Sequence, residues 1–349
     1  MSTTLPFAGT RTPEHDGVHG RGPSHQHDGV RGRDRGPAGL AVVAKEAVAE
    51  HTVALTLAAP DRGRLPDWAP GAHVDLHLGE GRIRQYSLCG DRWDPTTYRV
   101  GIKLDPAGRG GSRWVHEQLR VGDVVPFGGP RNTFRMRPAP SYLFLGAGIG
   151  ITPLLPMIEQ AERLGVTWRC VAVGRSRAAM PFLAELERHG GKVEFVETSV
   201  AGRCDLREAI GALDGTAGVY ACGPERFLTP LLGLEPELAL PPGGLRVEHF
   251  TAPADAAPAG GASFELELAR SGRVLEVPAD RTVLDALREA GRTVLASCEQ
   301  GLCGTCETDV LAGTPDHRDS VLAPHEREAG TCMMPCVSRS LTPRLTVDL

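Results

Sequence analysis

Three cysteines near the C-terminal end of the chain have the spacing of metal-cluster ligands. Cys298, Cys303 and Cys306 form a Cys-x4-Cys-x2-Cys loop, which is the plant-type spacing for a [2Fe–2S] cluster. Gly301 and Gly304 lie inside this loop, and glycine lets a backbone curve closely around a cluster. The sequence therefore predicts an iron–sulfur site that needs one further thiolate.

The fourth ligand can come from either of two later cysteines, Cys332 and Cys336. Zinc is the alternative metal because thiolates also bind it tetrahedrally, but zinc sites usually contain two Cys-x-x-Cys pairs and this loop contains one. Of the nine cysteines, five lie in the last 52 residues, whereas a secreted disulfide framework is dense throughout. We therefore interpret the loop as an iron–sulfur site.

Two segments in the first half of the chain can bind a phosphate-bearing cofactor. Arg84-Gln85-Tyr86-Ser87 lies at the end of a predicted strand, where a guanidinium can pair bidentately with phosphate and the tyrosine ring can lie against a flavin. Gly110-Gly111-Ser112 precedes a predicted short helix that Ser112 can cap, and free N–H groups at a helix N-terminus attract anions. Together the two segments indicate a flavin site.

A glycine-rich segment predicts a site for a dinucleotide. Gly146-Ala147-Gly148-Ile149-Gly150-Ile151-Thr152 joins an apolar strand to a helix that Thr152 can cap, so a pyrophosphate can lie on the helix N-terminus. Cys222-Gly223-Pro224 follows a later strand. The strand at 166–173 is followed by Arg175 and Arg177 rather than by an acidic residue, which favours a 2′-phosphate and hence NADPH.

Hydrophobic periodicity divides the chain into units that position these segments. Short alternating runs from Leu40 onward predict an antiparallel β-barrel, and strands alternating with helices from Ser141 onward predict a doubly wound α/β sheet. After residue 262, a hairpin and a helix that begins with Thr282 and Asp285 precede the cysteine loop. The expected units are a disordered tail at 1–38, a barrel at 39–138, an α/β domain at 139–251, a linker at 252–262 and a cluster domain at 263–349.

Composition argues against several other classes of protein. No apolar run approaches the roughly 20 residues that span a bilayer, and the N-terminus lacks the pattern of a signal peptide, so we expect a cytoplasmic protein without membrane contact. The net charge is −5, and no basic cluster with interleaved aromatics indicates nucleic-acid binding. The segment from Ser263 onward has fourteen acidic and nine basic residues, which favours docking to a basic partner surface.

These motifs, in this order over residues 39–349, resemble those of the phthalate dioxygenase reductase family, to which vanillate demethylase reductases also belong. The resemblance implies an FMN-binding barrel, an NAD(P)-binding domain and a C-terminal β-grasp ferredoxin domain with a [2Fe–2S] cluster. In plant-type ferredoxins 29 residues separate the third ligand from the last, a spacing that Cys336 meets and Cys332 does not. The implied ligands are therefore Cys298, Cys303, Cys306 and Cys336.

The resemblance also implies roles for the flavin and nucleotide segments. Residues 84–87 match an Arg-x-Tyr-Ser signature, and residues 110–112 stand where the family holds the flavin phosphate, which implies FMN rather than FAD. Cys222-Gly223 is placed near the nicotinamide, and Phe250, in the Glu248-His249-Phe250 ending, is placed over the flavin. Family habit favours NADH, whereas Arg175 leaves NADPH possible.

The implied function is electron transfer. NAD(P)H gives a hydride to the flavin, which releases electrons singly to the cluster, and the cluster passes each electron to a partner protein. No side chain is expected to act as a catalytic acid or base, because positioning carries the reaction. The expected acceptor of a monomeric reductase is a Rieske non-haem iron oxygenase. The alternatives are a haem monooxygenase as acceptor, or a zinc-stabilised, non-catalytic interaction module.

Overall fold

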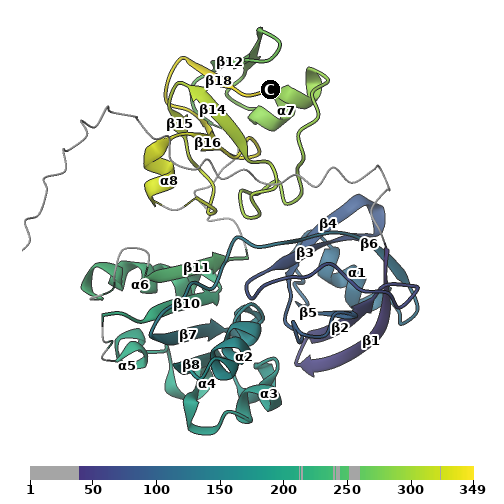
Figure 1. The fold of residues 1–349 in the computed structure, drawn as a ribbon, viewed down its shortest axis with the longest axis vertical. Coiled ribbons are helices and arrows are strands. Elements are labelled where there is room, and N and C mark those ends of the chain that lie inside the picture. Colours follow the sequence, from purple (N-terminus) through teal and green to yellow (C-terminus); the bar gives the residue numbers. More distant parts are fainter. Residues whose placement is uncertain are drawn as a thin grey trace, which may run out of the picture. The chain divides into compact units, whose positions relative to one another are not determined.

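The computed structural model describes residues 39–349 except 212, 214, 239, 241–243, 251–259 and 323. The tail predicted at 1–38 and most of the linker predicted at 252–262 lie outside the described residues. Within the described part, the strands form three sheets of five or six strands and one two-stranded sheet (Figure 1). No helix among these residues is both long and apolar enough to cross a membrane.

The first sheet contains six strands in the order β4-β3-β6-β1-β2-β5, and all neighbouring pairs are antiparallel. Beyond β4, Leu88 forms a single bridge with Val100 of β5. This bridge links the two edge strands of the expected barrel, although no continuous ladder joins them among the described residues. The elements are β1 (Gly39–Ala49), β2 (Thr52–Ala58), β3 (His73–Leu78), β4 (Arg82–Ser87), β5 (Thr97–Lys103), α1 (Gly111–Glu117) and β6 (Val124–Arg131).

The second sheet is parallel, with the order β11-β10-β7-β8-β9. The chain runs from β7 to β8 on one side and returns to β10 on the other, so the strand order reverses at β7, where nucleotides bind in such sheets. The elements are β7 (Ser141–Ala147), α2 (Leu155–Arg163), β8 (Thr167–Gly174), α3 (Leu183–Glu187), β9 (Val193–Glu197), α4 (Thr198–Ala201), α5 (Leu206–Ile210), β10 (Gly218–Gly223), α6 (Glu225–Leu234) and β11 (Leu245–His249).

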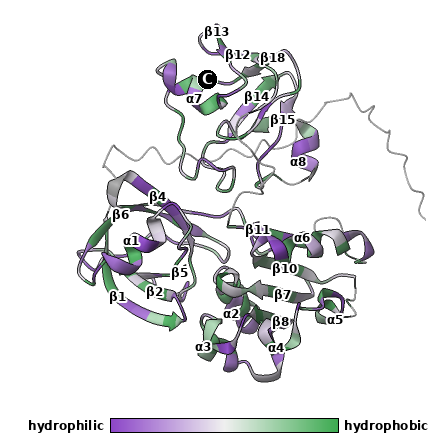
Figure 2. Ribbon diagram, turned by 180° about the vertical axis from the view of Figure 1, so that it is seen from behind, coloured by the Kyte–Doolittle hydropathy of each residue, from purple (hydrophilic) through white to green (hydrophobic). Residues whose placement is uncertain are grey.

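Both faces of the parallel sheet are covered, which explains why its central strands are apolar. Along β7, Tyr142 and Phe144 pack in a core with residues of α2 and α3, whereas Leu143 and Leu145 pack in another with residues of α5 and α6. Hydrophobic residues accordingly recur along β7 and β10 (Figure 2). A strand that is buried on both faces has a continuous run of apolar residues. The run in β7 is the pattern that predicted the α/β domain from the sequence.

The third sheet has the order β13-β12-β18-β14-β16, in which β12 and β18 are parallel and the other pairs antiparallel. Thr282 and Asp285 form a capping box at the start of α7, as the sequence predicts. The elements are β12 (Phe264–Leu268), β13 (Arg273–Val277), α7 (Val283–Glu289), β14 (Thr308–Ala312), β15 (Pro315–Asp316), α8 (Pro324–Ala329), β16 (Cys332–Met333), β17 (Arg339–Ser340) and β18 (Arg344–Val347). β15 and β17 pair separately.

The first two sheets share a hydrophobic core. Ala54 of β2 and Cys89 pack in the same buried cluster as Phe144 of β7 and Phe182. At its margin, Arg99 Nη1 donates to Glu185 Oε1 over 2.6 Å. The sheets that carry the predicted flavin and nucleotide segments therefore pack against each other. The domain boundaries expected from the sequence remain predictions.

Two helix starts differ from those that the sequence predicts. Thr152 does not cap α2, because its hydroxyl donates to the carbonyl of Ile149 over 2.9 Å and the helix begins at Leu155. Ser112 does not cap α1, because the helix begins at Gly111 and the Ser112 hydroxyl accepts the N–H of Asp105 over 3.0 Å. In both places a nearby backbone group provides the hydroxyl with another partner.

Candidate functional site

The two predicted flavin segments lie against each other. Arg84 Nη2 donates to the carbonyl of Arg109 over 3.0 Å. A Cβ added at Gly111 would lie 2.8 Å from Arg84 Nε, so glycine is needed for this close packing. Gly110, with φ +80°, precedes α1 in the left-handed region, which glycine adopts without strain. Burial, and then the Arg109 cation, lower the pKa of Arg84, but a guanidinium stays charged in proteins.

Arg82 belongs to the same site, although the sequence pattern gave it no role. A Cβ added at Gly110 would lie 3.4 Å from Arg82 Nε, and Arg82 Nη1 donates to the carbonyl of Gly79 over 2.9 Å. Two guanidinium groups therefore flank the glycine pair at the start of α1. This combination of fixed cations and free helix N–H groups suits a phosphate.

Further along β4, the predicted flavin residues Gln85 and Tyr86 are half-buried and Ser87 is buried. Tyr86 packs against the barrel core, and burial raises the pKa of its phenol above its usual value, so the ring stays neutral. Ser87 is 5% exposed, and its hydroxyl donates to Glu248 Oε2 over 3.4 Å. Gln85 Nε2 donates to the hydroxyl of Ser297, beside the cysteine loop, over 3.4 Å.

The glycine-rich segment after β7 lies directly against the segment after β10. A Cβ added at Gly150 would lie 2.2 Å from the carbonyl oxygen of Cys222, and one at Gly223 would lie 2.7 Å from Cβ of Ala147. Gly148 has φ +57°, and a Cβ at Gly146 would meet Ile151 Cδ1 at 2.7 Å. The structure thus brings together the two segments to which the sequence assigned the dinucleotide.

We expect Gly150→Ala to damage nucleotide use selectively, because the new methyl group overlaps a backbone oxygen that cannot move without shifting β10. The kcat/KM for NADH should fall by about 10-fold or more in a flavin-reduction assay, with flavin and iron contents unchanged. Gly233→Ala is the matched control, because nothing lies within 4 Å of a Cβ at that helical position. Equal kinetics for the two variants would show that the close approach has no role.

A buried polar group joins Ser87, Cys222 and Glu248. Cys222 is 0% exposed, and its thiol lies 4.0 Å from Glu248 Oε2, the oxygen that accepts from Ser87. Burial raises the pKa of Glu248 to about 8, and the Ser87 hydrogen bond offsets part of this rise. Glu248 therefore holds a proton at neutral pH, beside the Cys222-Gly223 segment. Glu248 was not predicted as a site residue, since only the tertiary structure brings its carboxyl to Ser87 and Cys222.

This raised pKa predicts how stability depends on pH. Between about pH 4.5 and 8 the unfolded chain loses the Glu248 proton while the native chain keeps it, so the free energy of unfolding falls as pH rises. Glu248→Gln should remove this loss and become more stable than the wild type at pH 8 by on the order of a few kcal/mol. At about pH 5 the difference should be small.

Urea unfolding followed by flavin fluorescence at the two pH values measures this effect. Glu235→Gln serves as the control, because Glu235 is an exposed carboxylate directly after α6. A Glu248→Gln difference that stays constant between pH 5 and 8 would contradict a protonated Glu248.

The remaining nucleotide-site residues surround this region with differing exposure. Thr152 is 1% exposed, and its Cγ2 lies 2.8 Å from the position that a Cβ on Gly101 of β5 would take. Arg175 follows β8 and is exposed. Phe250 follows β11 and is 38% exposed, so its ring is free to cover a ligand. Its place over the flavin stays a prediction.

Four cysteines meet in the third domain. The sulfurs of Cys306 and Cys336 are 3.3 Å apart. Hydrogen bonds from the thiols of Cys303 and Cys336 hold the pKa of Cys298 well below its usual range, which places all four sulfurs in one group. Cys332 lies on β16, paired with Asp309 of β14, and burial raises the pKa of its thiol to about 12.

The backbone of the cysteine loop points N–H groups at the sulfurs. Gln300 and Leu302 donate to Cys298 Sγ over 3.3 and 3.4 Å, and Thr305 donates to Cys303 Sγ over 3.4 Å. Gly301 has φ +69°, and a Cβ there would lie 2.9 Å from Cα of Asp319. Converging thiolates with backbone N–H donors are the donor set of an iron–sulfur cluster, so the residues present fit the expected group.

The cysteine loop also contacts the predicted flavin segments. Besides the bond between Gln85 and Ser297, Arg109 Nη2 donates to Gln300 Oε1 over 2.8 Å. Arg109 supplies the carbonyl that Arg84 binds, and Gln300 lies within the cysteine loop. Two hydrogen bonds therefore join the loop and the residue before it to Gln85 and to Arg109, the residue before the glycine pair.

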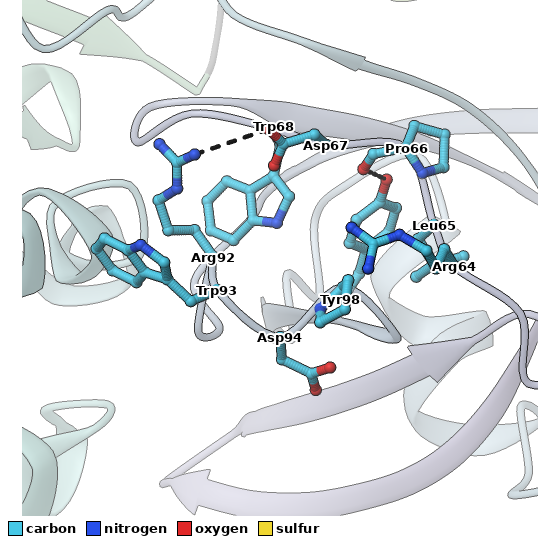
Figure 3. A pocket seen from close by; sticks show the side chains of 10 residues that line it. Arg64, Leu65, Pro66, Asp67, Trp68, Arg92, Trp93, Asp94 and Tyr98 are labelled. Carbon is cyan, nitrogen blue, oxygen red and sulfur yellow. Dashed lines mark hydrogen bonds and ion pairs between the residues drawn. The ribbon is translucent and has the colours of Figure 1, made fainter.

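A cavity of about 310 Å³ lies elsewhere on the barrel (Figure 3). The indole of Trp68 lies between Arg92 and Tyr98, and Arg92 points toward Asp67, 3.7 Å away. The hydroxyl of Tyr98 donates to the carbonyl of Pro66 over 2.5 Å. None of the predicted site residues lines this cavity, which separates it from the flavin and nucleotide segments.

Sequence comparison shows relatives that match nearly the whole chain. A family described as "2Fe-2S iron-sulfur cluster binding domain" matches residues 266–341. The chain is 41% identical over 319 residues to the phenoxybenzoate dioxygenase subunit beta of Ectopseudomonas oleovorans, covering 90% of this chain and 98% of that protein. The match to the cluster family includes all four converging cysteines.

Two solved structures are similar to this chain over 90% of its length. Phthalate dioxygenase reductase, described as a modular structure for electron transfer from pyridine nucleotides to [2Fe–2S], matches with a TM-score of 0.65 and 32% identity, over 98% of its chain. An intact type IV self-sufficient cytochrome P450 monooxygenase matches with a TM-score of 0.82 and 40% identity. In that second case this chain spans only 41% of the longer protein.

Proposed function

The chain belongs to the phthalate dioxygenase reductase-like family of oxygenase reductases, and on this basis we propose that it carries electrons from NADH through FMN and a [2Fe–2S] cluster to an oxygenase component. The observation that carries the proposal is the convergence of four cysteine sulfurs under backbone N–H donors. The same chain also contains the predicted phosphate-binding segment of the flavin site and the glycine-rich segment predicted to bind a dinucleotide. The protein is thus an oxidoreductase whose product is a reduced partner protein.

FMN is held chiefly through its phosphate. We assign the phosphate to Arg84, Gly110, Gly111 and Ser112, with Arg82 as an additional cation. When bound, the flavin accepts a hydride and gives up its electrons one at a time. The residues of this chain supply position and charge: Tyr86 gives a neutral aromatic surface, and Ser87 fixes the Glu248 carboxyl beside Cys222.

The nucleotide is bound across the ends of β7, β8 and β10. Gly146, Gly148 and Gly150 keep the backbone open for a pyrophosphate, and the Cys222-Gly223 segment borders the nicotinamide. The protonated Glu248 adds no negative charge next to this segment. Phe250 supplies a ring that can cover the flavin until the nicotinamide replaces it.

The cluster is held by Cys298, Cys303, Cys306 and Cys336. N–H groups that point at the sulfurs stabilise the reduced, more negative state of such a cluster. Hydrogen bonds from Gln85 and Arg109 join the cluster loop to the flavin segments. The cluster ligands are therefore placed next to the flavin site, where they can receive its electrons.

The electron acceptor is an oxygenase component, as suggested by relatives that are named as subunits of dioxygenases. A Rieske non-haem iron oxygenase is our first candidate, and the acidic residues from Ser263 onward suit a basic docking surface on it. A haem monooxygenase is the second candidate, because the chain matches part of a self-sufficient P450 with a TM-score of 0.82. We expect the reductase itself to act as a monomer.

Anaerobic titration with NADH tests the function on the full-length protein. The visible bands of both the flavin and the [2Fe–2S] cluster should bleach. The number of electrons taken up per chain should exceed the two that a flavin alone accepts. A zinc-containing interaction module would show no absorption beyond the flavin bands and no further electron uptake, and that result would reject the proposal.

A further inference from the structure

We propose that Glu197 is the residue that makes this reductase select NADH over NADPH. The inference rests on the proposed function, because it concerns the nucleotide that the same site binds. The sequence shows no acidic residue at the end of β8, where a dinucleotide fold usually places the carboxylate that binds the ribose hydroxyls. The structure brings a carboxylate to this place from the neighbouring strand.

Glu197 lies beside the end of β8 because of the strand register. It is the last residue of β9, and its Cα partner in the parallel ladder is Gly174, the last residue of β8. The carboxyl ends of parallel strands form the edge where nucleotides bind. Glu197 therefore replaces, from the next strand, the acidic residue that β8 lacks.

Two hydrogen bonds fix this carboxylate on the loop after β8. Glu197 Oε2 accepts the backbone N–H of Arg177 over 3.1 Å. Beyond β9, the N–H of Ser199 donates to the carbonyl of Arg175 over 3.0 Å. The loop and the end of β9 are thereby held together. Among the residues that the structure describes, the second carboxylate oxygen, Oε1, has no hydrogen-bond partner, so it can accept from hydroxyl groups of a ribose.

The side chain of Arg177 is directed toward other partners. Its guanidinium forms an ion pair with Glu187 at the end of α3, and its Cζ lies 4.8 Å from the centre of the Phe195 ring. Arg175 is exposed, so its attraction for a phosphate is screened by water. A 2′-phosphate would therefore meet a fixed, partly buried carboxylate beside the solvated cation of Arg175, whereas two ribose hydroxyls would meet an acceptor.

Flavin reduction by each nucleotide, measured by stopped-flow on the full-length protein, tests the proposal. We expect the wild type to have at least about 10-fold higher kcat/KM for NADH than for NADPH, and Glu197→Gln to lower this ratio by about 10-fold. Glutamine keeps an oxygen for the Arg177 N–H and removes only the charge. Glu194→Gln, an exposed carboxylate on the same strand, should leave the ratio unchanged.

Inhibition of the wild type checks the same point without a substitution. Adenosine 2′,5′-bisphosphate should compete with NADH at least about 10-fold more weakly than 5′-AMP. An unchanged NADH to NADPH ratio in Glu197→Gln, a preference of the wild type for NADPH, or equal inhibition by the two adenosine nucleotides would overturn the inference. If neither nucleotide reduces the wild-type flavin, the proposed function fails as well, so the two failures are distinguishable.

Discussion

Replacing Cys336 with serine is expected to abolish assembly of the [2Fe–2S] cluster. Cys336 is 3% exposed, and its sulfur lies 3.3 Å from that of Cys306, so no other thiol can take its place without moving buried backbone. A hydroxyl is a poor iron ligand compared with a thiolate. The purified variant should contain almost no iron and should lose the cluster's visible absorption, yet NADH should still reduce its flavin.

Cys332→Ser is the matched control for this experiment. Cys332 is only four residues away in the chain, but it lies on β16, and its thiol hydrogen-bonds none of the four converging cysteines among the described residues. We expect wild-type iron content and absorption. A cluster that survives in Cys336→Ser and is lost in Cys332→Ser would reverse the ligand assignment that rests on the resemblance to ferredoxins.

Replacing Arg84 with alanine is expected to weaken FMN binding by about 100- to 10,000-fold. Arg84 packs on Gly111 at the start of α1, and each charge-assisted hydrogen bond to a phosphate contributes about 1.5–3 kcal/mol. Two such bonds correspond to two or more factors of ten in Kd. Titration of the flavin-depleted protein with FMN, followed by quenching of flavin fluorescence, measures the change.

Arg92→Ala tests whether the loss of any barrel arginine has this effect. Arg92 lines the separate cavity of Figure 3 and lies 3.7 Å from Asp67, so FMN affinity should stay at the wild-type value. Arg84→Lys should retain only part of the affinity, since an ammonium cannot form the planar bidentate contact. An unchanged affinity for FMN in Arg84→Ala would show that the flavin phosphate does not bind at this site.

Local sequence signals predict those features that depend on neighbouring residues. The capping box of Thr282 and Asp285 is correct because both partners lie within one turn. The helix starts at Thr152 and Ser112 are wrong, because each hydroxyl binds a backbone group that the pattern does not identify. The cysteine loop was recognisable because three ligands share one short segment.

Site residues that are brought together by strand register could not be predicted from the sequence. Glu248 belongs to the site because β11 lies beside β10, which brings its carboxyl to Cys222 and Ser87. Glu197 reaches the end of β8 through the register of β9. Arg82 flanks Gly110 because β4 approaches the start of α1. Each of these contacts links segments separated along the chain, and a single sequence does not show which segments become neighbours.

Electron paramagnetic resonance of the full-length protein, reduced anaerobically with NADH and frozen, tests the central claim most directly. Electrons that pass from the nucleotide through the flavin to the four-cysteine site should produce the rhombic signal of a reduced [2Fe–2S] cluster at close to one spin per chain. Cys336→Ser should lack this signal although its flavin is reduced. A wild-type sample with fully reduced flavin and no rhombic signal would contradict the account.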